Sequence, residues 1–271
     1  MTPEDVAFVR FHMQNWLQLG IAENDYARIA DILRIPAAEV SALCAAYDAE
    51  NRAVGDSLPK GAVPPLIRSV RVAFIGDSIT SDRTSYLRIL RETLRERADI
   101  TLCNCAVSAW KSVDVVQAFG ESVRPYRPNA AVVMIGANDM LGFRDRPADT
   151  VVSLSEYRRN LQLIGEFLRA EGAAAVFNTI PPVLPTRTAV QIPSDHWAFY
   201  GAHVRACNTV IRDVCRDEGG TLNDMEAAFE QEKERFLDAD GLHLSLAGQA
   251  ETAARTLAAL GAHLCRHGFC A

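Results

Sequence analysis

The stretch Val70-Arg71-Val72-Ala73-Phe74-Ile75-Gly76-Asp77-Ser78-Ile79-Thr80 decides the fold of this chain. Its first half, residues 70–75, is apolar and has the length of a buried strand. The Gly-Asp-Ser that follows predicts a tight turn that opens a helix. Backbone N–H groups in the first turn of a helix have no partner within the helix. The stretch therefore predicts a strand–turn–helix unit that presents Ser78 at the end of a strand, beside free N–H groups.

Short apolar segments alternate with amphipathic ones from residue 61 onward. We expect strands over 70–75, 100–103, 131–135, 174–179 and 221–223, and helices over 85–97, 112–119, 153–171, 196–217 and 246–265. This order predicts an α/β fold whose parallel sheet is covered by helices on both faces. Ligands of such sheets bind beyond the carboxyl ends of the strands. Ser78, residues 104–109 and Asn138 all follow predicted strands, so they should share one site.

Residues 1–60 have a different character. Three helices are expected there: over 4–19, from Asn24 or Asp25 to Arg34, and from Pro36 through Tyr47. A connector rich in proline and glycine, residues 58–65, follows them. We therefore divide the chain into a helical N-terminal extension, 1–60, and an α/β domain, 61–271.

The turn between the second and third helices suggests a helix-turn-helix, which the charge of this segment argues against. Residues 1–60 carry nine acidic and five basic side chains. A DNA-binding helix needs Lys and Arg for the phosphates. We favour a docking, oligomerising or lid-like extension, with a homo-oligomer formed through residues 1–60 as one form of it.

Composition narrows the class of protein further. The chain has 271 residues, 49% hydrophobic, and a net charge of −6, which disfavours nucleic acid as a partner. No apolar window is long enough for a membrane span, and no secretory signal is recognisable, so we expect a cytoplasmic protein. The seven cysteines are irregularly spaced, which favours free thiols, with a disulfide between Cys265 and Cys270 left open.

The segment 237–245 holds the groups that a nucleophilic serine requires. A serine hydroxyl needs a nearby base, and the base needs an orienting partner. His243 is the best candidate base. Asp240, three residues earlier, can reach back to the imidazole, and Asp238 is its rival. His196 lies in a predicted pocket loop and is the other histidine of interest.

Negative charge that develops on an attacked carbonyl also needs donors. The Ser78 N–H is one candidate and the side-chain amide of Asn138 is a second. Asn138 lies in Gly136-Ala137-Asn138-Asp139, directly after a predicted strand. The alternative for Asn138-Asp139 is an ordinary turn or a helix cap.

Gly-Asp-Ser at 76–78, Gly-Ala-Asn-Asp at 136–139 and Asp-Gly-Leu-His at 240–243 make the sequence resemble the SGNH (GDSL-type) hydrolases. The resemblance covers most of residues 68–265 and includes Asn208. It implies a three-layer α/β/α, flavodoxin-like fold with five parallel strands. It also implies an esterase, lipase, thioesterase or carbohydrate deacetylase that needs no metal or cofactor.

One segment departs from the family pattern. The family has glycines in a segment of the type Asn-x-Gly-x-x-Gly, where this chain has Asn104-Cys-Ala-Val-Ser-Ala109. The resemblance makes Ala109 the third oxyanion donor, through its N–H. Alanine keeps that N–H, but its methyl group disfavours a positive φ.

The resemblance implies a serine esterase that acts through an acyl-enzyme. We expect short acyl groups, such as acetyl, on a carbohydrate or another small molecule. Asp77, Trp110 and Arg187 are expected to contact the substrate, together with the loops 140–150 and 181–197. Trp110 can stack on a sugar ring or simply pack. Two alternatives stay open: an acyltransferase that uses the same residues, and a non-catalytic module that works through the N-terminal helices.

Overall fold

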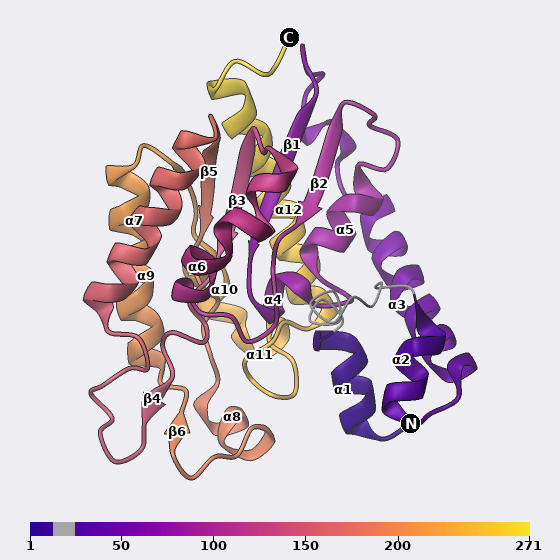
Figure 1. Ribbon diagram of the computed structural model, residues 1–271, viewed down its shortest axis with the longest axis vertical. Helices are drawn as coiled ribbons and strands as arrows, with labels where there is room; N and C mark the ends of the chain where they lie inside the picture. The colour runs from indigo at the N-terminus through magenta and orange to yellow at the C-terminus, as the bar shows by residue number, and fades with distance from the viewer. Residues whose placement is uncertain (13–24) are drawn as a thin grey trace.

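The computed structural model describes residues 1–12 and 25–271. Its centre is a five-stranded sheet (Figure 1). In spatial order the strands are β2 (Ile100–Asn104), β1 (Val70–Gly76), β3 (Ala130–Met134), β5 (Ala174–Asn178) and β7 (Thr221–Asn223). All neighbouring pairs are parallel. The parallel sheet expected from the sequence is confirmed, and each strand boundary falls within one residue of its predicted place.

Helices cover both faces of this sheet. The first face carries α5 (Tyr86–Thr93) and α12 (Leu246–Arg266), which pack against each other. The second carries α6 (Ser112–Ser122), α7 (Leu154–Ala170) and α9 (Gly201–Asp217). Figure 1 shows α6 in front of the strands and α12 behind them. The three-layer arrangement is therefore confirmed.

The central strands are apolar along their whole length because both of their faces are buried. Every residue of β3 is buried, and only Arg71 is exposed in β1. Serines define where several helices begin. Ser85, Ser153 and Ser245 each accept a hydrogen bond from the backbone N–H three residues later, which satisfies a donor at the helix start.

Several predicted helix boundaries were wrong. The helix expected over 196–217 begins only at Gly201, because β6 (Trp197–Ala198) pairs antiparallel with β4 (Gly142–Phe143). His196 therefore lies before this helix and not on it. The helix expected over 85–97 ends at Thr93. The helix predicted to open at Ser78 is the short α4 (Ser78–Ser81). Short helices that the sequence did not reveal are α8 (Pro185–Gln191), α10 (Met225–Phe229) and α11 (Lys233–Phe236).

The N-terminal helices are α1 (Pro3–His12), α2 (Tyr26–Leu33) and α3 (Ala37–Ser57). The rest of the first predicted helix, residues 13–19, lies outside the described residues. Asp25 caps α2, accepting a hydrogen bond from the Arg28 N–H. The third helix runs to Ser57, well beyond its predicted end, because it packs along α5.

A small apolar cluster holds these three helices together. Its buried members are Val9, Ile29, Ala30, Val40 and Cys44. These apolar side chains of the three helices are thus buried against one another within one chain. The homo-oligomer and the domain boundary at residue 60 stay predictions.

The cysteines divide into two kinds. Cys265 and Cys270 form a disulfide, so free thiols were the wrong expectation for this pair. The reason is local: α12 ends at Arg266, and Gly268, with a φ of +71°, reverses the chain. The other five cysteines are buried thiols, as expected. The cytoplasmic location stays a prediction. In the described ranges, no helix combines the length and the apolar character that crossing a bilayer would require.

Candidate active site

Ser78 lies where the sequence placed it, at the first residue of α4 and directly beyond β1. Asp77 caps this short helix, since its Oδ1 accepts a hydrogen bond from the Ile79 N–H at 3.1 Å. Gly76 is needed before this turn, because a Cβ there would lie 2.4 Å from the Thr80 hydroxyl and 2.7 Å from the Met134 carbonyl oxygen. Close packing of the turn against the sheet thus fixes the position of the serine.

A row of three polar side chains ends on this serine. His243 Nε2 lies 2.8 Å from Ser78 Oγ, and His243 Nδ1 lies 2.6 Å from Asp240 Oδ2. The other carboxylate oxygen of Asp240 accepts hydrogen bonds from the backbone N–H groups of Leu242 and His243, both at 2.9 Å. The structure therefore brings together the serine, the imidazole and the carboxylate that the sequence predicted.

The loop 237–245 holds the imidazole in place by its own hydrogen bonds. The Asp238 N–H donates to the His243 carbonyl at 2.8 Å, and the Gly241 N–H donates to the Asp238 carbonyl at 3.0 Å. Gly241 has a φ of +71°, a conformation that favours glycine. Asp238, the rival partner for the imidazole, instead binds Arg10 at 2.7 Å. The geometry thus decides between the two aspartates in favour of Asp240.

The electrostatics of Asp240 fit a partner for a cation. Burial alone would raise the pKa of this carboxyl, but the hydrogen bond and charge of His243, with the two backbone N–H donors, lower the pKa to about 2. Asp240 is therefore ionised across the ordinary pH range. A fixed negative charge beside Nδ1 stabilises a protonated imidazole.

Two of the three candidate oxyanion donors, Ala109 and Asn138, lie on the loops after β2 and β3. Ala109 is exposed and has a φ of +66°, the left-handed conformation that the family's glycine would adopt freely. The Asn138 side-chain amide donates to the Trp110 carbonyl at 3.0 Å, which ties the two loops together. An amide nitrogen has two N–H groups, so a second donor stays available at Asn138.

Asp139 holds the end of the Ala109 loop by hydrogen bonds to Ser112. Its carboxylate accepts hydrogen bonds from the backbone N–H and the hydroxyl of Ser112, the first residue of α6. Asn160 of α7 donates to the same hydroxyl at 3.0 Å. Burial raises the pKa of Asp139 to about 6, although the bonds from Ser112 work in the opposite direction. Asp139 thus lies in the turn 137–140, as the sequence alternative expected, while its carboxylate binds the first residue of α6.

The three predicted substrate contacts lie in different surroundings. Asp77 is buried in the α4 cap, and burial raises its pKa to about 6. Arg187 forms an ion pair with Glu234 and donates to the Asp238 carbonyl at 3.4 Å. Trp110 is half-buried beside Ala109. Substrate contact by any of them stays a prediction.

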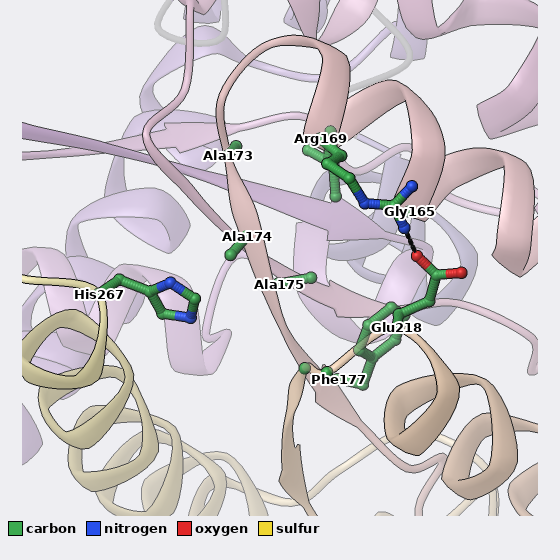
Figure 2. A pocket seen from close by; sticks show the side chains of 11 residues that line it. Gly165, Arg169, Ala173, Ala174, Ala175, Phe177, Glu218 and His267 are labelled. Atoms are coloured by element: carbon green, nitrogen blue, oxygen red, sulfur yellow. Dashed lines mark hydrogen bonds and ion pairs between the residues drawn. The ribbon is translucent and has the colours of Figure 1, made fainter.

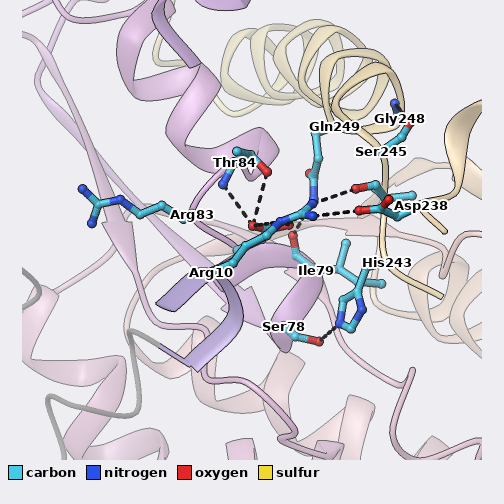
Figure 3. A network of polar contacts seen from close by, with 12 residues as sticks. Arg10, Ser78, Ile79, Arg83, Thr84, Asp238, His243, Ser245, Gly248 and Gln249 are labelled. Atoms are coloured by element: carbon cyan, nitrogen blue, oxygen red, sulfur yellow. Dashed lines mark hydrogen bonds and ion pairs between the residues drawn. The ribbon is translucent and has the colours of Figure 1, made fainter. Parts of the chain in front are cut away.

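Sequence reasoning missed several residues that hold this site together. Gln249 of α12 accepts a hydrogen bond from the Tyr86 N–H at 2.8 Å and donates to the Ile79 carbonyl at 3.3 Å, which joins α4, α5 and α12. Asn208, which the family resemblance singled out, makes a paired contact with the backbone of Ile180. Arg10 spans the site, as Figure 3 shows. No motif marks Gln249 or Arg10, because each acts on residues far away in the sequence.

A cavity of about 220 Å³ lies elsewhere, at the amino end of β5 (Figure 2). Arg169 and Glu218 form an ion pair on its wall, and His267 lies across from them. None of the residues discussed above lines this cavity. It opens at the opposite end of the strand from the Ser78 site, so it is separate from that site.

A parallel sheet with a serine, a histidine and an aspartate in one hydrogen-bonded row at its carboxyl edge defines the class of serine hydrolases. Within this class, the family model of the GDSL-like lipase/acylhydrolase family matches residues 74–251. The chain therefore belongs to that family and is a carboxylic ester hydrolase. The resemblance seen in the sequence is confirmed, and the non-catalytic alternative loses its basis.

Solved structures support the same fold. A lipase/acylhydrolase from Enterococcus faecalis matches with a TM-score of 0.60 at 19% identity, over 71% of this chain and 96% of that one. A hydrolase from the metagenome of Lake Arreo in Spain matches with a TM-score of 0.57 at 22% identity, over 72% and 96%. An acetylxylan esterase from Geobacillus stearothermophilus matches with a TM-score of 0.58 at 20% identity, over 73% and 97%. Among proteins with curated descriptions, none matches the sequence significantly.

Proposed function

We propose that this protein hydrolyses short-chain acyl esters, such as acetyl esters of a carbohydrate or another small molecule, through an acyl-enzyme on Ser78. The observation that carries the proposal is the unbroken contact from Ser78 through His243 to Asp240, with distances of 2.8 and 2.6 Å. A serine hydroxyl is a poor nucleophile until a base of this kind removes its proton.

In the proposed reaction, Ser78 Oγ attacks the acyl carbonyl while its proton passes to His243 Nε2. Asp240 holds Nδ1–H and stabilises the imidazolium. The N–H groups of Ser78 and Ala109 and the amide of Asn138 stabilise the oxyanion. The imidazolium then protonates the departing alcohol, and the acyl group stays on Ser78. A water molecule, deprotonated by the same imidazole, attacks the acyl-enzyme and releases the acid.

Two observations favour a small acyl group. Ser78 is only 8% exposed, and the half-buried Trp110 adjoins the Ala109 donor. In addition, the Geobacillus stearothermophilus structure with this fold is an acetylxylan esterase. Short acyl chains need the least room beyond the attacked carbonyl.

The test is removal of the nucleophile. We expect Ser78→Ala to lower the kcat for p-nitrophenyl acetate by about 10³-fold or more, because the acyl group then has no acceptor. It should also abolish labelling by a fluorophosphonate. Ser81→Ala, three residues later in the same short helix, is the matched control and should keep both. Turnover retained in the Ser78→Ala protein contradicts the assignment.

A series of p-nitrophenyl esters from acetate to octanoate then tests the acyl size, and the kcat/KM should fall with chain length. Product analysis in the presence of added alcohols separates hydrolysis from acyl transfer. Free acid as the main product supports the proposal, and a new ester as the main product contradicts it.

A further inference from the structure

The helix α1 lies outside residues 74–251, the segment shared with the family, yet it contacts both halves of the reactive pair. Figure 1 shows α1 at the same end of the sheet as α4 and α11. Two consecutive side chains make the contacts. Arg10 reaches both of the segments that carry Ser78 and His243, and Phe11 lies against the imidazole.

Arg10 joins the helix of the nucleophile to the loop of the base. Its Nε and Nη2 each donate to the Asp82 carboxylate at 3.0 Å, and its Nη1 donates to Asp238 at 2.7 Å. Asp82 ends α4, the helix that begins at Ser78. Asp238 opens the loop that holds Asp240 and His243. Figure 3 shows Arg10 between these two segments.

The surroundings of Arg10 show that this contact is built into the fold. The side chain of Asp82 is fully buried, and that of Arg10 is only 17% exposed. Asp82 also accepts the Thr84 N–H at 3.0 Å, and the Arg10 carbonyl accepts the Arg83 N–H at 3.0 Å. A buried carboxylate that loses its cation is costly, so α1 cannot leave without disturbing the turn after Ser78.

Phe11 covers one face of the imidazole. The two ring centroids lie 4.1 Å apart, with an angle of 23° between the planes. Both ring nitrogens of His243 stay in use within the plane of the ring, toward Asp240 and Ser78. The Arg10 guanidinium also lies over the Phe11 ring, with its Cζ 4.7 Å from the ring centroid. The Phe11 ring is thus in contact with both Arg10 and the imidazole, and it restrains the plane of the imidazole.

We propose that α1 is a working part of the active site, in which Arg10 and Phe11 are both positioning residues. Arg10 fixes the separation between the serine and the histidine loop, and Phe11 holds the plane of the imidazole. The inference rests on the proposed function above and deepens it.

Phe11 is tested by separating kcat from KM for p-nitrophenyl acetate. For Phe11→Leu we expect kcat to fall by about threefold to tenfold with little change in KM, because leucine cannot stack flat on the imidazole. The matched control is Phe8→Leu, the same change one turn earlier in the same helix, which should leave kcat unchanged. Equal kcat values in the two variants overturn the role of Phe11.

Arg10 is tested by separating kcat from KM. We expect Arg10→Ala to lower kcat by about tenfold or more with little change in KM, because the serine and the imidazole lose their fixed separation. Arg10→Lys should restore part of this loss. Arg52→Ala removes another ion pair of the N-terminal helices, to Glu92 at 3.2 Å, and should keep the wild-type kcat. An equal loss in Arg10→Ala and Arg52→Ala overturns the positioning role.

Two further measurements test the Arg10 link even if Arg10→Ala does not fold or the proposed function is wrong. Asp238→Asn weakens the link to the histidine loop but keeps the Arg10–Asp82 pair, so it should lower kcat in a folded protein even where Arg10→Ala unfolds. A double-mutant cycle of Arg10→Ala and Asp238→Asn, read by denaturant unfolding, needs no activity. If the cycle shows a coupling free energy between Arg10 and Asp238 but fluorophosphonate does not label the wild type, the proposed function is refuted and the Arg10 link stands. If the cycle shows no coupling free energy, the Arg10 link is refuted and the proposed function is unaffected.

Discussion

Ala109 adopts a φ of +66°. The family resemblance places it at a glycine position and makes it a candidate oxyanion donor. An alanine in this conformation costs about 1–2 kcal/mol, because its Cβ crowds the following carbonyl. Its N–H points as that of glycine would, since the backbone and not the side chain sets its direction. The chain therefore keeps the candidate N–H donor of residue 109, but the strained φ lowers the stability of the fold.

We predict that Ala109→Gly stabilises the protein by about 0.5–1 kcal/mol and leaves kcat nearly unchanged. Relief of the strained φ exceeds the entropy that glycine adds to the unfolded chain. Denaturant unfolding and p-nitrophenyl acetate turnover measure the two effects. Ala106→Gly is the control: Ala106 is fully buried and has no positive φ, so glycine there should destabilise. A loss of stability in Ala109→Gly would contradict the strain argument.

Asp139 gives the stability a pH dependence with a definite sign. Burial raises its pKa from 3.8 to about 6, so between these values the folded protein holds a proton that the unfolded chain releases. The stabilising contribution is full below about pH 4 and is lost as the pH rises through 6. The free energy of unfolding of the wild type, relative to Asp139→Asn, should fall by up to about 3 kcal/mol between pH 4 and 7. Denaturant unfolding at each pH measures this difference in free energy. A difference that stays constant from about pH 4 to 7 would refute the role of Asp139.

At the level of single residues, sequence motifs predicted the candidate catalytic side chains. They did not predict the residues that hold these side chains in place. Ser78, Asn138 and His243 stand in short segments whose residue types already imply chemistry. Arg10 binds Asp238 across 228 positions, and Gln249 contacts Ile79 across 170. Nothing local distinguishes such an arginine or glutamine from a solvated one, because only the folded chain brings the partners together.

Among the elements, length and regularity decided what could be predicted. β7 has only three residues, but it follows a long helix at the spacing of a βαβ unit, and it was predicted correctly. The pair of β4 and β6 has two residues in each strand, too few for an alternating pattern. Because β6 pairs with β4, α9 begins at Gly201 and not at residue 196, where helix propensity alone had predicted its start.

The contact of α3 with α5 depends on Gly55. A Cβ at this position would lie 2.8 Å from the Glu92 Cβ and 3.0 Å from backbone atoms of Ile89 and Thr93. We predict that Gly55→Ala destabilises the protein by about 1–2 kcal/mol, since overpacking outweighs the better helix propensity of alanine. Thermal and denaturant unfolding measure this loss. Gly61→Ala is the control, because nothing lies within 4 Å of its Cβ. Equal stability in the two variants would show that α3 can move away freely.

The molecule as a whole has two hydrophobic cores of very different size. The large one fills the space between the sheet and its helices, and the small one holds α1, α2 and α3 together. Stability is expected to follow this division, because regions with few buried apolar contacts open at lower free energy. Ion pairs and the α3–α5 contact connect the two parts.

We predict that backbone amides of α2 exchange with deuterium faster than those of β1 and β3 under native conditions. The five fully or nearly fully buried residues of the small cluster give α2 less protection than the buried strands have. Hydrogen exchange followed by mass spectrometry of peptic fragments measures the difference. Equal protection of α2 and the central strands would mean that the chain opens as a single cooperative unit.

Ser78 and His243 touch although 165 positions separate them along the chain. Because translation proceeds from residue 78 toward residue 243, Ser78 leaves the ribosome before its proposed base. We expect no turnover of p-nitrophenyl acetate from a nascent chain that has not yet released residue 243. The order of these two residues would then delay the proposed reaction until the sheet and its helices have formed.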